Sequence, residues 1–176
     1  MTNSEAAKIV RTVLCRGLNF EQTEQILKAM VAVNVEAGGV LYHEEEKSKG
    51  LFVLLEGGLE VLKREPGGGD RRIATLDAPT VVGEMSLLTD RPHSATVRAL
   101  SACEGRLLTR AQFERLLHGE SLAAYKIVLT LADVIAKRLN KMDEKVLELT
   151  RQGASPAPRV EELAAYKQKL FNEWSI

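Results

Sequence analysis

The sequence predicts an α+β fold built around an antiparallel, jelly-roll-like β-roll with helices before and after it. Three observations lead to this prediction. Short apolar runs follow one another between residues 31 and 108, and turns rich in glycine or proline separate them. No helices of ordinary length alternate with these runs, which argues against a parallel sheet. Helical periodicity instead occupies both ends of the chain.

Residues 1–30 are expected to form two helices. The first covers residues 5–16, where apolar side chains recur at helical spacing on one face. Asn19 is a good N-cap and Gln22 follows three residues later, so a second helix is expected to begin there and to run through Met30. The apolar face of the first helix consists of Ile9, Val10, Val13 and Leu14.

Strand patterns begin where alternation replaces the helical period, and the roll is assigned to residues 31–118. The polar run 43–50 is expected to be a loop, and residues 66–70, with three glycines, an open hairpin turn. The expected strands are 31–35, 40–42, 51–55, 59–62, 72–76, 94–100 and 105–108, with a turn at 101–104. Thr109 is expected to cap a helix that begins at Arg110.

Composition excludes several classes of function. The 176 residues allow one core of ordinary domain size plus an appendage. With 24 basic and 24 acidic residues the net charge is zero, so the chain lacks the basic field that DNA or an anionic membrane requires. No targeting sequence or membrane span is evident. Cys15 and Cys103 are expected to be buried free thiols in a reducing compartment, which indicates a cytoplasmic protein. Because of the neutral net charge and the lack of a membrane span, we expect it to bind neither DNA nor membranes.

The segment 83–96 carries the most specific chemical signal. Gly83 and Glu84 open a short helix at Met85, and a helix start offers unpaired backbone N–H groups to an anion. Glycine lets the backbone approach a ligand closely, and a neighbouring carboxylate can accept hydrogen bonds from sugar hydroxyls. Together these groups are suited to binding a phosphate and a ribose.

Gly83-Glu84-Met85-Ser86-Leu87-Leu88, followed by Pro92-His93-Ser94-Ala95-Thr96, closely resembles the phosphate-binding cassette of the cyclic nucleotide-binding domain family. We call residues 83–96 the cassette. The resemblance covers roughly residues 10–150 and implies a roll of about eight strands and a ligand such as cAMP or cGMP, with no other cofactor. Three departures stand out, one of them at residues 76–80, which replace the usual glycine-containing approach to the cassette. His93 occupies the position of the family's phosphate-binding arginine, and Glu45 occupies a loop position where glycine is usual.

The resemblance also implies roles for individual residues. Glu84 would bind the ribose, and His93 would lie at the phosphate. Backbone N–H groups near four further cassette residues would face the phosphate. In relatives of the catabolite-activator type, residues on the dimer helix contact the base, and the corresponding positions here are Met142 and Asp143. The four residues with N–H groups expected at the phosphate are Met85, Ser86, Ser94 and Ala95.

His93 determines the strength of any binding. Arginine offers a charged fork, whereas neutral imidazole offers one N–H donor. Hydrogen bonds to charged groups contribute roughly 1.5–3 kcal/mol, so affinity is expected to fall by about ten- to a hundredfold. A nearby phosphate anion would favour the charged form of the ring, which could take up a proton from solvent and restore part of the charge. The alternative is that His93 packs in an empty pocket.

Residues 119–150 are expected to form a long dimerisation helix. Its apolar residues follow spacings of four and three without a break, which is the pattern of a two-stranded coiled coil. We expect a parallel homodimer through residues 122–150, and packing against the chain's own roll is the alternative. The heptad seam consists of Val128, Ala132, Ile135, Leu139, Met142, Val146 and Leu149.

Residues 151–159 have the composition of a linker, and residues 160–176 that of a short amphipathic tail helix. A winged helix-turn-helix, which DNA-binding members of the family carry here, needs several dozen residues and does not fit. The apolar face of the tail consists of Leu163, Tyr166, Leu170 and Trp174.

Two functions follow. The first is a stand-alone cyclic nucleotide-binding regulator that signals through a protein partner. The second is a degenerate member that acts as a ligand-independent interaction module. We expect no enzyme and no catalytic residues, because His93 and Ser94 are adjacent on one extended segment and point to opposite sides. We also expect no metal site, since the three histidines lie far apart in sequence.

Overall fold

The computed structural model describes residues 3–14, 17–65 and 67–152. Cys15, the tail 160–176 and all of the linker after Gln152 lie outside the described residues. The chain divides into two compact units, residues 1–135 and 136–176, and each is described by itself.

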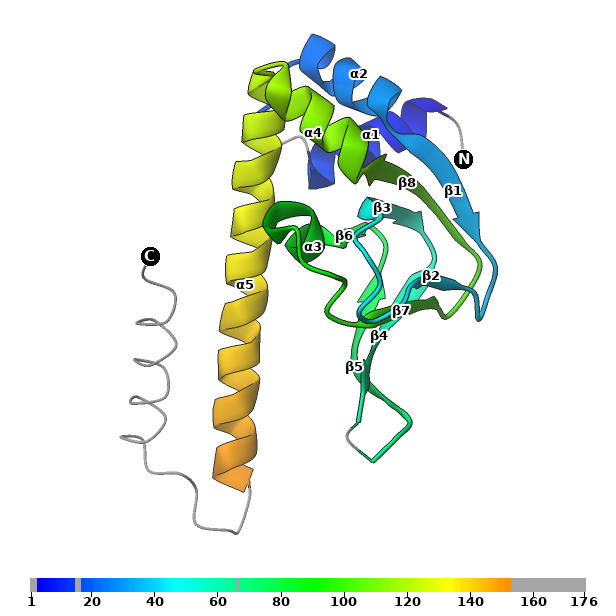
Figure 1. Ribbon diagram of the computed structural model, residues 1–176, viewed down its shortest axis with the longest axis vertical. Helices are drawn as coiled ribbons and strands as arrows, with labels where there is room; N and C mark the ends of the chain where they lie inside the picture. Colours follow the sequence, from blue (N-terminus) through cyan, green and yellow to red (C-terminus); the bar gives the residue numbers. More distant parts are fainter. Residues whose placement is uncertain (1–2, 15–16, 66, 153–176) are drawn as a thin grey trace. The chain divides into compact units, whose positions relative to one another are not determined.

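The predicted α+β fold with an eight-stranded antiparallel roll is confirmed (Figure 1). Two four-stranded sheets form the roll, with strand orders β1-β8-β3-β6 and β2-β7-β4-β5. The strands are β1 Val31–Val35, β2 Val40–Tyr42, β3 Gly50–Glu56, β4 Gly58–Arg64, β5 Asp70–Asp77, β6 Thr80–Val82, β7 Thr96–Ala99 and β8 Cys103–Thr109.

Three strand predictions need correction. Strand β6 was not expected, because its place in the sheet depends on pairing with β3 and not on a local pattern. The predicted turn 101–104 ends earlier, since Cys103 and Glu104 already pair with β1. Strand β7 covers only residues 96–99 of the predicted 94–100, so the closing part of the cassette is irregular backbone.

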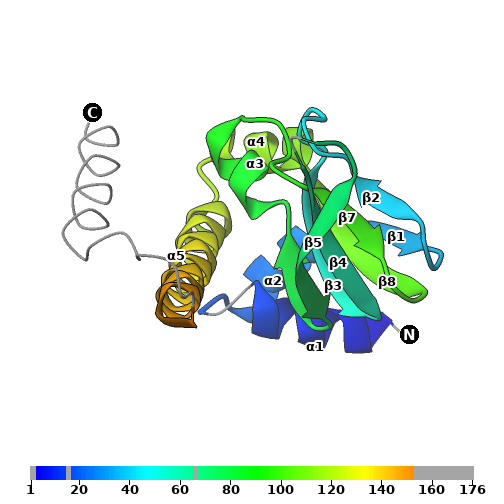
Figure 2. The same cartoon turned by 90° about the horizontal axis from the view of Figure 1, so that it is seen from below.

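The N-terminal helices pack under the roll (Figure 2). Helix α1 (Asn3–Val13) ends three residues before the predicted position, and helix α2 covers Phe20–Ala29. The predicted N-cap is confirmed: the Asn19 side chain accepts a hydrogen bond from the Gln22 N–H at 2.9 Å, and the Gln22 side chain accepts one from the Asn19 N–H at 3.1 Å.

Strand β3 separates two hydrophobic clusters. Leu51, Val53 and Leu55 face the helices, whereas Phe52 and Leu54 face the interior of the roll. Because both faces of the strand are buried, its sequence is continuously apolar instead of alternating. Strand β3 therefore lies between the interior of the roll and a layer of helices.

The cassette connects the two sheets. Strand β6 ends beside β3, with Val82 opposite Phe52, and the chain then forms helix α3 (Glu84–Thr89) before β7 joins the other sheet. After β8, helix α4 (Arg110–His118) begins with the predicted Thr109 cap, which pairs reciprocally with Gln112. The cassette therefore lies between a strand of one sheet and a strand of the other.

Helix α5 (Leu122–Gln152) begins in the first unit and continues into the second. In the first unit, the seam residue Val128 packs against the chain's own core, next to buried Ile127 and Leu131. Val128 is only partly buried by these contacts, so its place in an intermolecular seam stays a prediction. In the second unit, three seam residues are exposed; they are Leu139, Met142 and Val146.

No helix in the described part of the chain combines the length and the apolar character needed to cross a membrane.

Candidate functional site

Gly83 caps helix α3 in a backbone conformation that a side chain would disrupt. Its φ is +87°, in the left-handed region. A Cβ at this position would lie 2.4 Å from the carbonyl oxygen of Gly50 and 3.1 Å from a ring carbon of Tyr42. Glycine is therefore required here by both conformation and space.

The first turn of α3 alternates between buried and exposed side chains. Glu84 is only 4% exposed, Met85 is exposed and Ser86 is buried. Burial and then the negative charge of Glu84 raise the pKa of Tyr42 well above its usual range, so Tyr42 stays neutral. The Tyr42 hydroxyl donates a hydrogen bond to the Gly50 carbonyl at 2.9 Å. A buried carboxylate thus lies close to a neutral phenol at the start of the cassette helix.

His93 turns inward and is 4% exposed. Its ring stacks on that of Tyr42, with centroids 3.9 Å apart and an interplanar angle of 14°. The main-chain N–H of Lys49 donates to Nε2 at 3.2 Å, and Nδ1 lies 3.0 Å from Oγ of Ser86. Because the Lys49 N–H can only donate, Nε2 carries no proton, and the proton of the neutral ring is on Nδ1.

Desolvation lowers the pKa of His93, with the Lys49 charge acting in the same direction and the Glu46 charge acting against them. The neutral ring therefore uses both of its nitrogens within the protein. In this arrangement it offers no N–H to a phosphate, in contrast to the single donor expected from the sequence.

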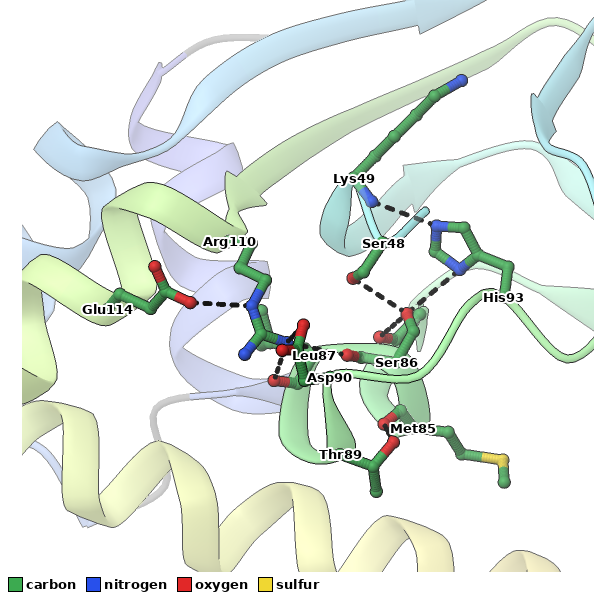
Figure 3. Close-up of polar contacts among 11 residues, drawn as sticks. Ser48, Lys49, Met85, Ser86, Leu87, Thr89, Asp90, His93, Arg110 and Glu114 are labelled. Carbon is green, nitrogen blue, oxygen red and sulfur yellow. Dashed lines mark hydrogen bonds and ion pairs between the residues drawn. The ribbon is translucent and has the colours of Figure 1, made fainter. Parts of the chain in front are cut away.

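Ser86 is the centre of the polar network in Figure 3. Its hydroxyl donates to the Gly83 carbonyl at 3.1 Å and accepts hydrogen bonds from Nδ1 of His93 and from the Ser48 hydroxyl, the latter at 3.1 Å. Ser86 therefore joins the start of α3, the closing segment of the cassette and the loop between β2 and β3.

The same loop also clamps the backbone of His93. The N–H of His93 donates to the Glu46 carbonyl, and the N–H of Glu45 donates to the His93 carbonyl, each at 2.8 Å. Glu45 adopts φ +65°, the left-handed conformation that explains why glycine is usual at this position. The loop keeps its shape with glutamate at the cost of local strain.

Arg110 ties the other end of α3 to helix α4. One guanidinium nitrogen donates to the carbonyls of Ser86 and Leu87, at 3.2 and 3.3 Å, and pairs with Asp90 at 3.1 Å. Its Nε donates to Glu114 at 2.7 Å (Figure 3). These contacts satisfy carbonyl groups at the C-terminal end of a helix, where a positive charge is favourable.

The remaining predicted site residues do not join this network. Ser94 is exposed and Ala95 is half-buried, and the Ser94 carbonyl accepts a hydrogen bond from the Lys63 ammonium at 2.8 Å. Met142 and Asp143 lie on α5 in the second unit, so their contribution to the cassette stays a prediction.

Sequence reasoning missed four residues of the network: Tyr42, Ser48, Lys49 and Arg110. Tyr42 looks like an ordinary core residue, and Lys49 contributes a backbone group that no side-chain motif reveals. No local pattern distinguishes Arg110. Among the residues described, no group of three or more histidine, cysteine, aspartate or glutamate side chains is placed to hold a metal ion.

Comparisons with known proteins bear on the fold and the family of this chain. The family model described as cyclic nucleotide-binding domain matches residues 32–120, about half of the chain. The chain is 30% identical over 111 residues to a cAMP-dependent protein kinase regulatory subunit from Blastocladiella emersonii, covering 63% of this chain and 28% of the relative. It is 29% identical over 107 residues to the cAMP-activated global transcriptional regulator CRP of Salmonella typhimurium, covering 60% and 49%. The chain thus spans less than half the length of these relatives.

Solved structures show the same fold. A cyclic nucleotide-binding domain from Methylobacillus flagellatus superposes with a TM-score of 0.75 at 22% identity, covering 87% of this chain and 85% of that one. The regulatory domain of Toxoplasma gondii PKA, crystallised with cAMP, gives a TM-score of 0.59 at 26% identity, covering 64% and 43%. The shared roll, the Gly83-Glu84 opening of α3 and the family match lead to one conclusion: this chain belongs to the cyclic nucleotide-binding domain family.

Proposed function

We propose that this chain is a regulatory domain that binds cAMP or cGMP with weakened phosphate recognition and passes the signal to a protein partner. One observation supports this proposal above all: Gly83 opens α3 with a left-handed turn packed closely against the Gly50 carbonyl, and the carboxylate of Glu84 lies buried next to it in the chain. A relative crystallised with cAMP has the same fold.

Weak phosphate recognition follows from the chemistry of His93. A neutral ring with both nitrogens engaged lacks the charged fork of an arginine. A hydrogen bond to a charged phosphate contributes about 1.5–3 kcal/mol to binding. Without it, nucleotide binding should be about ten- to a hundredfold weaker than with arginine. The ribose contact through Glu84 and the backbone donors do not depend on this residue.

We further propose a parallel homodimer through residues 122–150. The seam residues Leu139, Met142 and Val146 are exposed, which leaves an apolar stripe on α5 for a second copy. A protein partner would recognise a shift in the position of this helix or bind to the tail 160–176. This role is regulatory and not enzymatic.

The second candidate is a ligand-independent interaction module. The observation in its favour is that the protein's own groups bury His93 and contact both of its ring nitrogens. In this case the roll would serve as a rigid scaffold.

Calorimetric titration of cAMP and cGMP separates the two candidates. For a nucleotide sensor, the wild type binds weakly, His93→Arg binds about ten- to a hundredfold more tightly, and Glu84→Gln loses affinity. His118→Arg is the matched control, because it adds the same charge at an exposed histidine on α4. If neither the wild type nor His93→Arg binds either nucleotide, the interaction module is the remaining function.

A further inference from the structure

The hydrogen bonds of His93 suit only its neutral form. The main-chain N–H of Lys49 points at Nε2 from 3.2 Å, and a proton on Nε2 would set two donors against each other. Nδ1 already donates to the Ser86 hydroxyl, whose own proton is directed to the Gly83 carbonyl. Protonation therefore breaks the contact between His93 and the loop that carries Lys49.

The charged groups around the ring do not remove this conflict. From the β2–β3 loop, the Glu46 carboxylate and the Lys49 ammonium act on the ring in opposite directions, and they pair with each other at 2.9 Å. From β2, Tyr42 covers one face of the ring and is neutral. From α3, Glu84 is buried close to Tyr42, and Ser86 is uncharged.

The ring provides one of several links between the β2–β3 loop and the cassette. Besides the bond from the Lys49 N–H, the Ser48 hydroxyl donates to Ser86, which His93 also contacts. Release of the ring would remove the side-chain link between residues 48–49 and the closing segment. The backbone pair between His93 and residues 45–46 would remain. Movement of the ring is thus possible without separating the two segments.

We propose that His93 is a proton-dependent latch on the cassette: the neutral ring links the cassette to the β2–β3 loop, and binding of a cyclic phosphate breaks this link together with the uptake of one proton from solvent at Nε2. This inference rests on the proposed function, because it assigns a regulatory role to the same site. The released imidazolium then offers its Nε2–H to the phosphate anion, as the family's arginine would.

The direction of the pH effect follows from the two environments. Burial keeps the pKa of the latched ring below its ordinary value of 6.5, whereas a neighbouring anion raises the pKa of the released ring. Between these two values the complex holds more protons than the free protein. Nucleotide affinity should therefore increase as the pH falls, by up to about tenfold per pH unit. An arginine at this position would show no such dependence, because it is always charged.

Two measurements on the full chain test the latch. Long-range ¹H–¹⁵N spectra report the tautomer of each of the three histidines, and His93→Gln identifies the signal of interest. The expected result for the free protein at pH 7 is a neutral ring protonated at Nδ1. A ring protonated at Nε2, or a charged ring at pH 7, would overturn the latch without reference to any nucleotide.

Calorimetry with cAMP or cGMP in buffers of different ionisation enthalpy then counts protons. At pH 6.5 the wild type should take up a measurable fraction of one proton, and affinity should be higher at pH 6 than at pH 8. His93→Arg should bind without proton uptake, and His118→Gln should behave as the wild type. Binding without proton uptake would refute the latch and leave the proposed function intact. Absence of binding by the wild type and His93→Arg from pH 6 to pH 8 would refute the proposed function instead.

Discussion

The guanidinium group of Arg110 donates a hydrogen bond to the main-chain carbonyl of Ser86 across 3.2 Å. The hydroxyl of the same serine contacts His93. A single residue of α3 is therefore connected on one side to the first residue of α4 and on the other to the position of the family's arginine.

Loss of Arg110 should loosen this connection. We expect Arg110→Gln to lower the free energy of unfolding by about 1–2 kcal/mol, because it removes charge-assisted bonds to two carbonyls and two carboxylates from a largely covered side chain. Urea denaturation measures the effect. Arg115→Gln on the same helix is the matched control, since the exposed Arg115 makes one bond to a carbonyl of its own helix. Equal losses in both variants would contradict a specific role for Arg110.

Gly83 should tolerate no side chain. Gly83→Ala combines a left-handed φ with a Cβ 2.4 Å from the Gly50 carbonyl. The expected loss in the free energy of unfolding is about 2–4 kcal/mol. Gly68→Ala separates the two contributions, because Gly68 has φ +86° and nothing within 4 Å of the added carbon. Its loss should be only about 1 kcal/mol. Similar losses in both variants would show that the close approach of Gly83 to the Gly50 carbonyl contributes nothing to the loss in the free energy of unfolding.

The protein should lose stability as the pH is lowered, because His93 titrates. Burial lowers the pKa of the folded ring, so between that value and about 6.5 the unfolded chain binds more protons than the folded one. The stability contributed by the neutral ring is fully present above this window and is lost as the pH drops through it. The difference in melting temperature between pH 7.5 and pH 5.5 should therefore shrink in His93→Gln. In the exposed-site control His118→Gln it should equal that of the wild type, and an unchanged difference in His93→Gln would count against a buried neutral ring.

The coiled-coil prediction is tested by charge in the seam. Met142→Glu places a carboxylate in the proposed interface, so sedimentation analysis should show a monomer where the wild type sediments as a dimer. Lys141→Glu is the control, because this exposed residue lies one position outside the seam. A wild type that sediments as a monomer, or a Met142→Glu variant that remains dimeric, would refute the seam.

Much of the fold could be predicted because its signals are local. The caps at Asn19 and Thr109 depend on contacts between residues three apart, and both were predicted correctly. The continuous apolar run of β3 and the glycine-marked turns likewise predicted strands. Strand β6 was missed because its position depends on pairing with β3, which the local sequence does not show.

The sequence alone determined that this chain has a roll interrupted by a cassette with a glycine, a carboxylate and a histidine in set places. Only the tertiary structure decided what the histidine does. Its ring meets Tyr42 and the backbone of Lys49, the latter 44 residues away in the chain, and Arg110 reaches Ser86 from 24 residues away. Such contacts depend on strand register and on which way a side chain turns from irregular backbone. Neither leaves a periodic trace in the sequence, because the partner of a side chain is chosen by packing across the whole roll.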